Sequence, residues 1–372
     1  MPDKNASHQK PGLSHCALRN FIWALIAILS QSCGETKSLH LQPSQEAQKR
    51  ALESSSSIQE EHQGELHLFI LAGQSNMSGR GNLENLQHRE SDPAIYVFGN
   101  DYRWKVAQEP VDDPQDQLDL VSRDSGAGVG PSLAFASELR KNRSDAIGLI
   151  PCAMGATTMF EWERRLSPES LYGSCLQRSR EASKMGRIKA VLFFQGEWDA
   201  LDIGYDRLLA ENHRKPEKRS ENRIHYSDSK KALPAGMSEY QLGQRKMVIW
   251  PGPNEKYGNP PFVLRLDGRK GYNRSEPALW AYFFADFVDN IRHDLKQPEL
   301  PVVFAQIGTQ KRPEVYRHWT TVKKAQDALR MDRVTMIRTD DLSLKDSVHF
   351  SAESYIEIGK RFARAYLDNE MF

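Results

Sequence analysis

The chain has 372 residues, of which 39% are hydrophobic and 27% are charged, a balance typical of a globular protein and not of a wholly disordered chain. Its 50 basic and 49 acidic side chains leave a net charge of +1, so no nucleic acid is expected as a partner. No apolar run reaches the roughly 20 residues of a membrane-spanning helix, and four cysteines without a CxxC pair predict neither a disulfide scaffold nor a zinc site.

The first 64 residues are expected to lie outside the folded domain. Residues 1–33 have the layout of an export signal: basic residues, then an uncharged apolar run at 21–29, then small and polar residues up to Cys33. Cys33 also resembles a bacterial lipoprotein cleavage site, although the residues before it depart from the usual pattern. Residues 34–64 are polar and rich in Ser, Gln and Glu, which is typical of a flexible linker. We therefore expect a bacterial protein that is periplasmic, secreted or tethered to a membrane by a lipid on Cys33. The alternative is that the apolar run at 21–29 is a buried segment of the fold with a disordered leader.

From residue 65 onward, short apolar runs alternate with stretches of helical spacing. Strands are expected at 66–72, 94–98, 146–152, 189–194, 301–308 and 334–338, and helices at 132–141, 176–185, 278–295 and 321–329. A last helix follows Ser351, which can cap it. This alternation predicts a parallel, doubly wound α/β sheet, in which ligands bind beyond the carboxyl ends of the strands.

One long segment, at about 203–277, does not fit the alternation and is expected to be an insertion. Between residues 211 and 231 it carries seven basic and four acidic side chains, followed by Pro- and Gly-rich sequence with short β-like runs. Connections of this length are usually functional or disordered. The charged run is either a solvated face or a surface that recruits substrate. The insertion also carries Trp250, Tyr257 and Tyr272, whose rings are suited to stacking on sugars.

Residues suited to catalysis follow several of the expected strands. Ser75 stands in a Gly-Gln-Ser-Asn turn, where its hydroxyl can be exposed and nearby N–H groups can face an oxyanion. Gly155 and Gln195 follow two other strands and can each offer an N–H donor. Asp346, three residues before His349, can hold one imidazole nitrogen and leave the other to take a proton from Ser75. Each feature alone is also compatible with an ordinary turn or salt link, but together they indicate a hydrolytic site.

At these residues the chain resembles the SGNH hydrolase superfamily, and within it the carbohydrate esterases of family six and the sialate O-acetylesterase-like proteins. The GQSNM and QGE blocks together are far more specific than a lone GxSxG. The resemblance implies that residues 65–372 form a flavodoxin-like three-layer α/β/α sandwich with a mainly parallel central sheet. The matching segments run in the family's order: LFILAGQSNMSGRG (68–81), GVGPSLAFA (128–136), IGLIPCAMGATTMFEWER (147–164), KAVLFFQGEWDALD (189–202) and DSVHFSAESYIEIGKRFARAYL (346–367).

The resemblance also implies roles for individual residues. Ser75 matches the nucleophile and His349 the general base. Gly155 matches the backbone oxyanion donor, and Gln195 takes the place of a side-chain donor. Asp346 matches the acid that orients the histidine, but Glu197 of the QGE block competes with it for that role.

The implied activity is that of a serine esterase that removes O-acetyl groups from carbohydrates, with acetylxylan or sialic-acid-type substrates and no metal or organic cofactor. Two alternatives stay open: an SGNH lipase, thioesterase or arylesterase that acts on other esters, and a non-catalytic carbohydrate-binding protein of the cell surface. Arg80 and Glu161 are candidate sugar contacts. Ala156 and Trp198 depart from the family pattern near the mouth of the site, so the sequence predicts the chemistry better than the substrate, and it does not predict the oligomeric state.

Overall fold

The computed structural model describes residues 65–85, 92–141, 143–201 and 280–370, together with residues 58 and 277 and three short strands between 238 and 265. The expected leader at 1–33 with Cys33, and all of the expected linker at 34–64 except residue 58, lie outside the described residues, as do Trp250, Tyr257 and Tyr272. The described residues belong to one compact unit, 52–372. None of their helices is long and apolar enough to cross a membrane.

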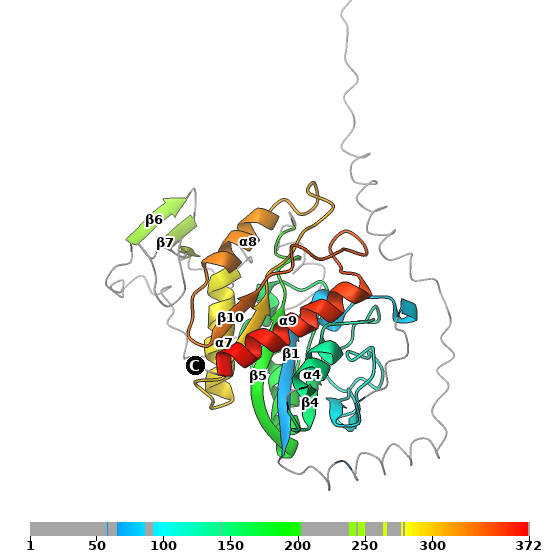
Figure 1. The fold of residues 1–372 in the computed structure, drawn as a ribbon. Helices are drawn as coiled ribbons and strands as arrows, with labels where there is room; N and C mark the ends of the chain where they lie inside the picture. The colour runs from blue at the N-terminus through cyan, green and yellow to red at the C-terminus, as the bar shows by residue number, and fades with distance from the viewer. Residues whose placement is uncertain are drawn as a thin grey trace, which may run out of the picture. The chain divides into compact units, whose positions relative to one another are not determined.

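Seven strands form one sheet in the order β10-β9-β5-β1-β4-β2-β3 (Figure 1). Every neighbouring pair is parallel except β2 and β3, which run antiparallel at one edge. The expected mainly parallel sheet is therefore confirmed. Its strands are β1 (Leu66–Gly73), β2 (Ile95–Phe98), β3 (Trp104–Val106), β4 (Ile147–Pro151), β5 (Gly186–Phe194), β9 (Val302–Ala305) and β10 (Val334–Ile337).

The central strand β1 is apolar along its length because both of its faces are covered. Leu68 and Ile70 belong to one buried hydrophobic cluster, whereas Phe69 and Leu71 belong to a second. Successive side chains of a strand point to opposite faces of the sheet, so each cluster receives every other residue. Such two-sided burial is typical of parallel sheets between layers of helices.

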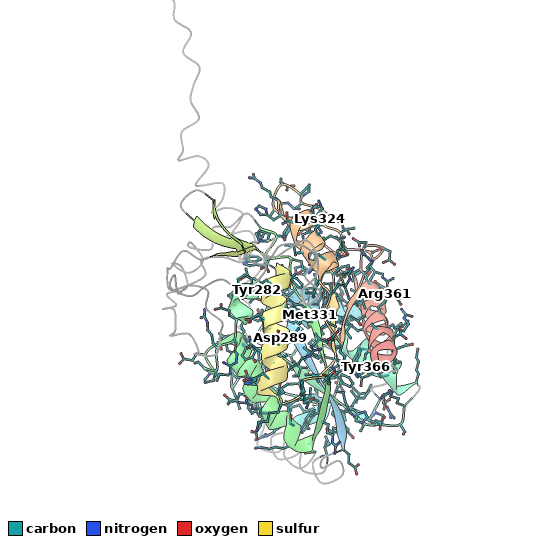
Figure 2. All side chains as sticks on the ribbon, turned by 90° about the vertical axis from the view of Figure 1, so that its left-hand side faces the viewer. Tyr282, Asp289, Lys324, Met331, Arg361 and Tyr366 are labelled. Atoms are coloured by element: carbon teal, nitrogen blue, oxygen red, sulfur yellow. A yellow bond between two sulfur atoms is a disulfide. The ribbon has the colours of Figure 1, made fainter. Side chains whose placement is uncertain are left out.

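Helices cover both faces of the sheet, which confirms the three-layer α/β/α architecture. The helices α4 (Ser132–Arg140) and α9 (Ala352–Glu370) pack together and contribute to one cluster; α5 (Leu171–Ala182), α7 (Trp280–Asp294) and α8 (Trp319–Ala328) contribute to the other. Figure 2 shows α7, with Tyr282 and Asp289, and α9, with Arg361 and Tyr366, on opposite sides of the sheet.

Side-chain caps explain where two of the helices begin. Ser351 Oγ accepts the N–H of Ser354 at 3.2 Å, so the expected cap of the last helix is present. At α5, Ser170 Oγ accepts the N–H of Gly173 at 3.0 Å and starts the helix five residues before the expected position 176. The sequence analysis missed this earlier start because it did not use Ser170 as a cap.

The expected insertion contains a small sheet of its own. The strands β6 (Ser238–Leu242), β7 (Arg245–Ile249) and β8 (Val263–Arg265) pair antiparallel in that order. They share no pairing with the seven-stranded sheet. The rest of 203–276 lies outside the described residues.

Two buried links join the end of β4 to α5 and so support the loop that follows β4. Cys152, directly after β4, forms a disulfide with Cys175. Arg178, a fully buried residue of the same helix, donates to the carbonyl oxygen of Pro151 at 2.7 Å and pairs with Asp119. A buried charge is tolerated when it is paired and hydrogen-bonded in this way. The sequence analysis did not predict the disulfide, because nothing in the spacing of the two cysteines marks it.

A buried carboxyl in the loop between β3 and α4 gives the protein a pH-dependent stability. Asp112 is 4% exposed and accepts a hydrogen bond from the Ser122 hydroxyl. Burial, partly offset by that hydrogen bond and by the charge of Arg178, raises the pKa of Asp112 to about 7. Between about pH 4 and pH 7 the native state therefore keeps a proton that the unfolded chain has lost.

We expect the contribution of Asp112 to the free energy of unfolding to fall by about 1.4 kcal/mol per pH unit across that window, and to stay constant above it. Asp112→Asn mimics the neutral carboxyl, so the variant should gain stability relative to the wild type as the pH rises. Urea unfolding at several pH values between about 4.5 and 8 measures the difference. Asp116→Asn, whose side chain is 57% exposed in the same loop, is the matched control. If the difference in free energy of unfolding between Asp112→Asn and the wild type did not change with pH, Asp112 would already be ionised in the native protein across this range.

Candidate active site

The nucleophile candidate lies at the carboxyl end of β1, where the chain makes a turn that requires glycine. Gly73 has a φ of +133°, and a Cβ at this position would come within 2.2 Å of the Phe194 carbonyl oxygen on β5. After this turn, Ser75 begins the short helix α3 (Ser75–Ser78), so its N–H has no acceptor within the helix. Ser75 lines a pocket that opens above the sheet.

His349 and Asp346 meet Ser75 from the loop between β10 and α9. His349 Nε2 lies 2.9 Å from Ser75 Oγ, and His349 Nδ1 lies 2.7 Å from Asp346 Oδ2. The other carboxylate oxygen of Asp346 accepts the N–H groups of Val348 at 3.0 Å and His349 at 2.8 Å. These bonds fix the carboxylate against its own loop. The three side chains form a continuous hydrogen-bond chain, an arrangement that can activate a serine hydroxyl for acyl transfer.

The electrostatic environment keeps Asp346 ionised. Burial favours the neutral carboxyl, but the hydrogen bond and charge of His349, with the two backbone N–H groups, outweigh it and lower the pKa of Asp346 to about 2. A carboxylate at this position is able to stabilise an imidazolium, should His349 accept a proton.

Glu197, the competing acid, has a different partner. It is 2% exposed, and its Oε1 accepts a hydrogen bond from Asn76 Nδ2. Its Oε2 is buried without a hydrogen-bond partner among the described residues, and burial raises the pKa of this carboxyl. The structure therefore joins Asp346, and not Glu197, to the histidine ring.

Asn76, which the sequence analysis did not single out, connects the loops of the site. Asn76 Nδ2 donates to the carbonyl oxygen of Val348 at 3.1 Å as well as to Glu197, and Asn76 Oδ1 accepts the hydroxyl of Tyr355 from α9. Asn76 thus joins the serine turn, the loop after β5 and the histidine loop. Its position beside Ser75 in the GQSNM block is the sequence signal that marks it.

Gly155 lies at the pocket, as expected from its place after β4. A Cβ there would come within 2.0 Å of an Asp124 carboxylate oxygen, so a side chain at this position would displace Asp124. Asp124 itself pairs with Arg80, which also lines the pocket. Glu161, the other candidate sugar contact, does not line the pocket; its carboxylate accepts the N–H of Thr158 at 2.8 Å.

Gln195 does not occupy the position expected of an oxyanion donor. It is fully buried and does not line the pocket. Its Nε2 donates to the carbonyl oxygen of Thr157 at 2.7 Å and to the carboxylate of Asp199, while its Oε1 accepts the indole N–H of Trp280 at 2.8 Å. An amide has two N–H donors, and both are engaged by protein acceptors. The expectation that Gln195 stabilises the oxyanion directly therefore does not fit this structure.

The pocket above Ser75 is open to solvent and has a volume of about 380 Å³. Two guanidinium groups, Arg80 and Arg123, line it together with Asp124 and Ser125. Ala156 and Trp198, which depart from the family pattern, line it as well. Among the described residues, no group of three or more His, Cys, Asp and Glu side chains is placed to hold a metal ion.

Comparison with known proteins identifies the class to which this site belongs. The model of a family described as "Carbohydrate esterase, sialic acid-specific acetylesterase" matches residues 65–213 and 268–368. A probable carbohydrate esterase of Arabidopsis thaliana, At4g34215, is 30% identical over 323 residues, which are 81% of this chain and 90% of that protein. Its X-ray structure has a TM-score of 0.55 at 25% identity, covering 82% of this chain and 99% of that one. A carbohydrate acetylesterase from Xanthomonas citri has a TM-score of 0.45 at 14% identity, covering 80% and 55% of the two chains.

The chain belongs to this family of carbohydrate esterases. It is therefore a carboxylic ester hydrolase, and the resemblance found in the sequence is confirmed. The family model leaves residues 214–267 unmatched, and these fall within the segment expected to be an insertion.

Proposed function

We propose that the protein is a serine esterase that removes O-acetyl groups from carbohydrates through an acyl-enzyme on Ser75. The observation that carries this proposal is the continuous hydrogen-bond chain from Ser75 Oγ through His349 to Asp346, at an open pocket. A serine hydroxyl is a weak nucleophile on its own and needs an oriented base within hydrogen-bond distance. The family membership supports the same reaction class.

The proposed reaction has two half-steps. His349 Nε2 takes the proton of Ser75 as Oγ attacks the acetyl carbonyl carbon, and the same proton then passes to the sugar oxygen as the ester bond breaks. A water molecule next gives a proton to His349 and attacks the acetyl-serine; His349 then returns that proton to Ser75 Oγ as the C–Oγ bond breaks and acetic acid leaves. We assign the N–H groups of Ser75, at the start of α3, and of Gly155, which lines the pocket, as the backbone donors to the oxyanion in both half-steps.

The character of the pocket favours a carbohydrate over a lipid substrate. Arg80, Arg123 and Asp124 line its wall with charge, and such groups hydrogen-bond sugar hydroxyls or carboxylates but cannot solvate an acyl chain. Acetylated sialic acids and acetylxylan are the two substrate types we propose. The family description names the first, and the guanidinium group of Arg123 suits a sugar carboxylate, whereas that of Arg80 is paired with Asp124.

The test is acetate release from acetylated sialic acids, xylans and pectins, compared with short-chain lipid and aryl esters. We expect the highest kcat/KM on one of the acetylated carbohydrates, and loss of this activity in Ser75→Ala. Equal or higher efficiency on lipid esters would support a general SGNH esterase. Binding of a carbohydrate without any serine-dependent turnover would support a non-catalytic surface protein.

We further propose that the protein is exported and acts outside the cytoplasm. The signal-like sequence at 1–33 motivates this proposal, and the buried Cys152–Cys175 disulfide supports it, because disulfides persist mainly in oxidising compartments. Protein purified from its native host should lack residues 1–32, and a lipid on Cys33 should add to the mass of its first peptide. Mass spectrometry of the N-terminal peptide measures both. An intact N-terminus on cytoplasmic protein with reduced cysteines would contradict the proposal.

A further inference from the structure

The side chain of Gln74, directly before the nucleophile, has its amide orientation fixed by its neighbours. Gln74 Oε1 lies 3.4 Å from the backbone nitrogen of Trp198 and 3.5 Å from that of Gly196. Both are donors only, so the amide oxygen must face them; a flipped amide would place N–H against N–H. Oε1 also lies 3.4 Å from Gln195 Nε2, but the two N–H groups of that amide are already engaged by Thr157 and Asp199, so it adds no further donor.

This orientation turns the amide nitrogen of Gln74 away from the loop after β5. Among the residues that the structure describes, none accepts a hydrogen bond from Nε2. Gln74 is 2% exposed, and it lines the pocket beside Ser75 and Gly155. Gln74 Nε2 is not one of the buried side-chain atoms that lack a partner among the described residues, so this nitrogen reaches the surface of the pocket, where a bound molecule can accept from it.

The proposed reaction leaves a place for such a donor. When Ser75 Oγ attacks, the acetyl carbonyl oxygen gains negative charge, and the two backbone N–H groups of Ser75 and Gly155 are available to it. The side-chain donor expected from the sequence, Gln195, has both N–H groups engaged elsewhere. Gln74 lies next to Gln195, on the pocket side of it.

We propose that Gln74 Nε2 is the side-chain donor of the oxyanion hole, completing the set formed by the N–H groups of Ser75 and Gly155. The inference rests on the proposed function. The proton stays on the amide throughout: Nε2–H donates a hydrogen bond that strengthens as the carbonyl oxygen becomes an oxyanion and weakens when the tetrahedral intermediate collapses. Because Oε1 is held by two backbone N–H groups, the donor is oriented before the substrate arrives, so little reorganisation is needed in the transition state.

Two substitutions separate this role from a structural one. Gln74→Leu removes both the donor and the acceptor. Gln74→Glu keeps an acceptor for the N–H groups of Gly196 and Trp198, but it replaces the donor with an oxygen that repels the oxyanion. We expect both variants to lower kcat for p-nitrophenyl acetate by about 10²- to 10³-fold with little change in KM, and Gln74→Glu to be no more active than Gln74→Leu. A purely structural role predicts the opposite ranking, with Gln74→Glu close to wild type.

The control is Gln115→Glu, which makes the same charge change at an exposed residue that does not line the pocket. A second readout is inhibition by an alkylboronic acid, which forms a tetrahedral adduct on the serine. Its inhibition constant should rise in Gln74→Leu in proportion to the loss of kcat/KM, because both report binding of the oxyanion. Thermal unfolding confirms that each variant is folded.

The outcomes distinguish this inference from the proposed function. Ser75-dependent turnover that stays within about threefold of wild type in folded Gln74→Leu and Gln74→Glu would overturn the inference alone. Wild-type protein without any Ser75-dependent ester hydrolysis would overturn the proposed function and the inference with it.

Discussion

Ser75→Ala and His349→Ala should each lower kcat by roughly 10⁴- to 10⁶-fold, and the double variant should be no more than about tenfold worse than either one. The reason is the 2.9 Å hydrogen bond between His349 Nε2 and Ser75 Oγ, through which we expect the two residues to act as one nucleophile–base unit. Without His349, Ser75 has no base to take its proton, and without Ser75, His349 has no hydroxyl to deprotonate. Steady-state and single-turnover kinetics on p-nitrophenyl acetate measure the losses.

His293→Ala provides the matched control for the histidine. Its side chain is 70% exposed near the end of α7, so its removal should leave kcat within about twofold. If the losses in Ser75→Ala and His349→Ala multiplied in the double variant, the two residues would act independently, and the hydrogen-bond chain would not be the catalytic unit.

The sheet and the positions of Ser75 and His349 were predictable because their signals are local. The run at 66–72 has the length and composition of a strand with two buried faces, and Gly73 marks the turn that ends it. Likewise, Asp346 and His349 lie three residues apart on one loop, so their hydrogen bond needs no information about the rest of the fold.

The hydrogen-bond partners of the Gln195 side chain could not be predicted from the sequence. Its place after β5 was predicted correctly, but its partners, Thr157, Asp199 and Trp280, come from three separate segments. Which acceptors a buried amide finds depends on packing among these segments, and the sequence carries no pattern for it. The GQSNM block likewise marks Gln74 as part of a motif, but only the distances to Gly196 and Trp198 show which end of its amide faces the pocket.

The sequence analysis also missed the strand β3 and the disulfide, each for its own physical reason. The strand β3 has only three residues and pairs with β2 alone, so it lacks the long apolar run that marks a buried strand. The disulfide between Cys152 and Cys175 depends on how α5 packs against β4, which the spacing of the cysteines does not encode.

Two carboxyls lie near His349, and their surroundings assign them different expected roles. Asp346 accepts from Nδ1 at 2.7 Å, and its pKa of about 2 keeps it ionised throughout the working pH range. Glu197 bonds to Asn76, and its burial raises its pKa and so favours the neutral acid. Ionised and hydrogen-bonded to the ring, Asp346 can stabilise the imidazolium and select the tautomer that leaves Nε2 free for Ser75.

Asp346→Asn should therefore lower kcat by about 10³- to 10⁴-fold, because an amide can hold the wrong histidine tautomer and carries no charge. Glu197→Gln should stay within about tenfold of wild type, since Gln has nearly the shape of the neutral acid and can still accept from Asn76. Asp341→Asn, whose carboxylate is 63% exposed, is the control for the aspartate substitution. Measuring kcat on p-nitrophenyl acetate, with thermal unfolding as a check on folding, ranks the three variants. If Glu197→Gln proved slower than Asp346→Asn, the orienting role would pass to Glu197, and its buried Oε2, which has no partner among the described residues, would be the atom that reaches His349 during turnover.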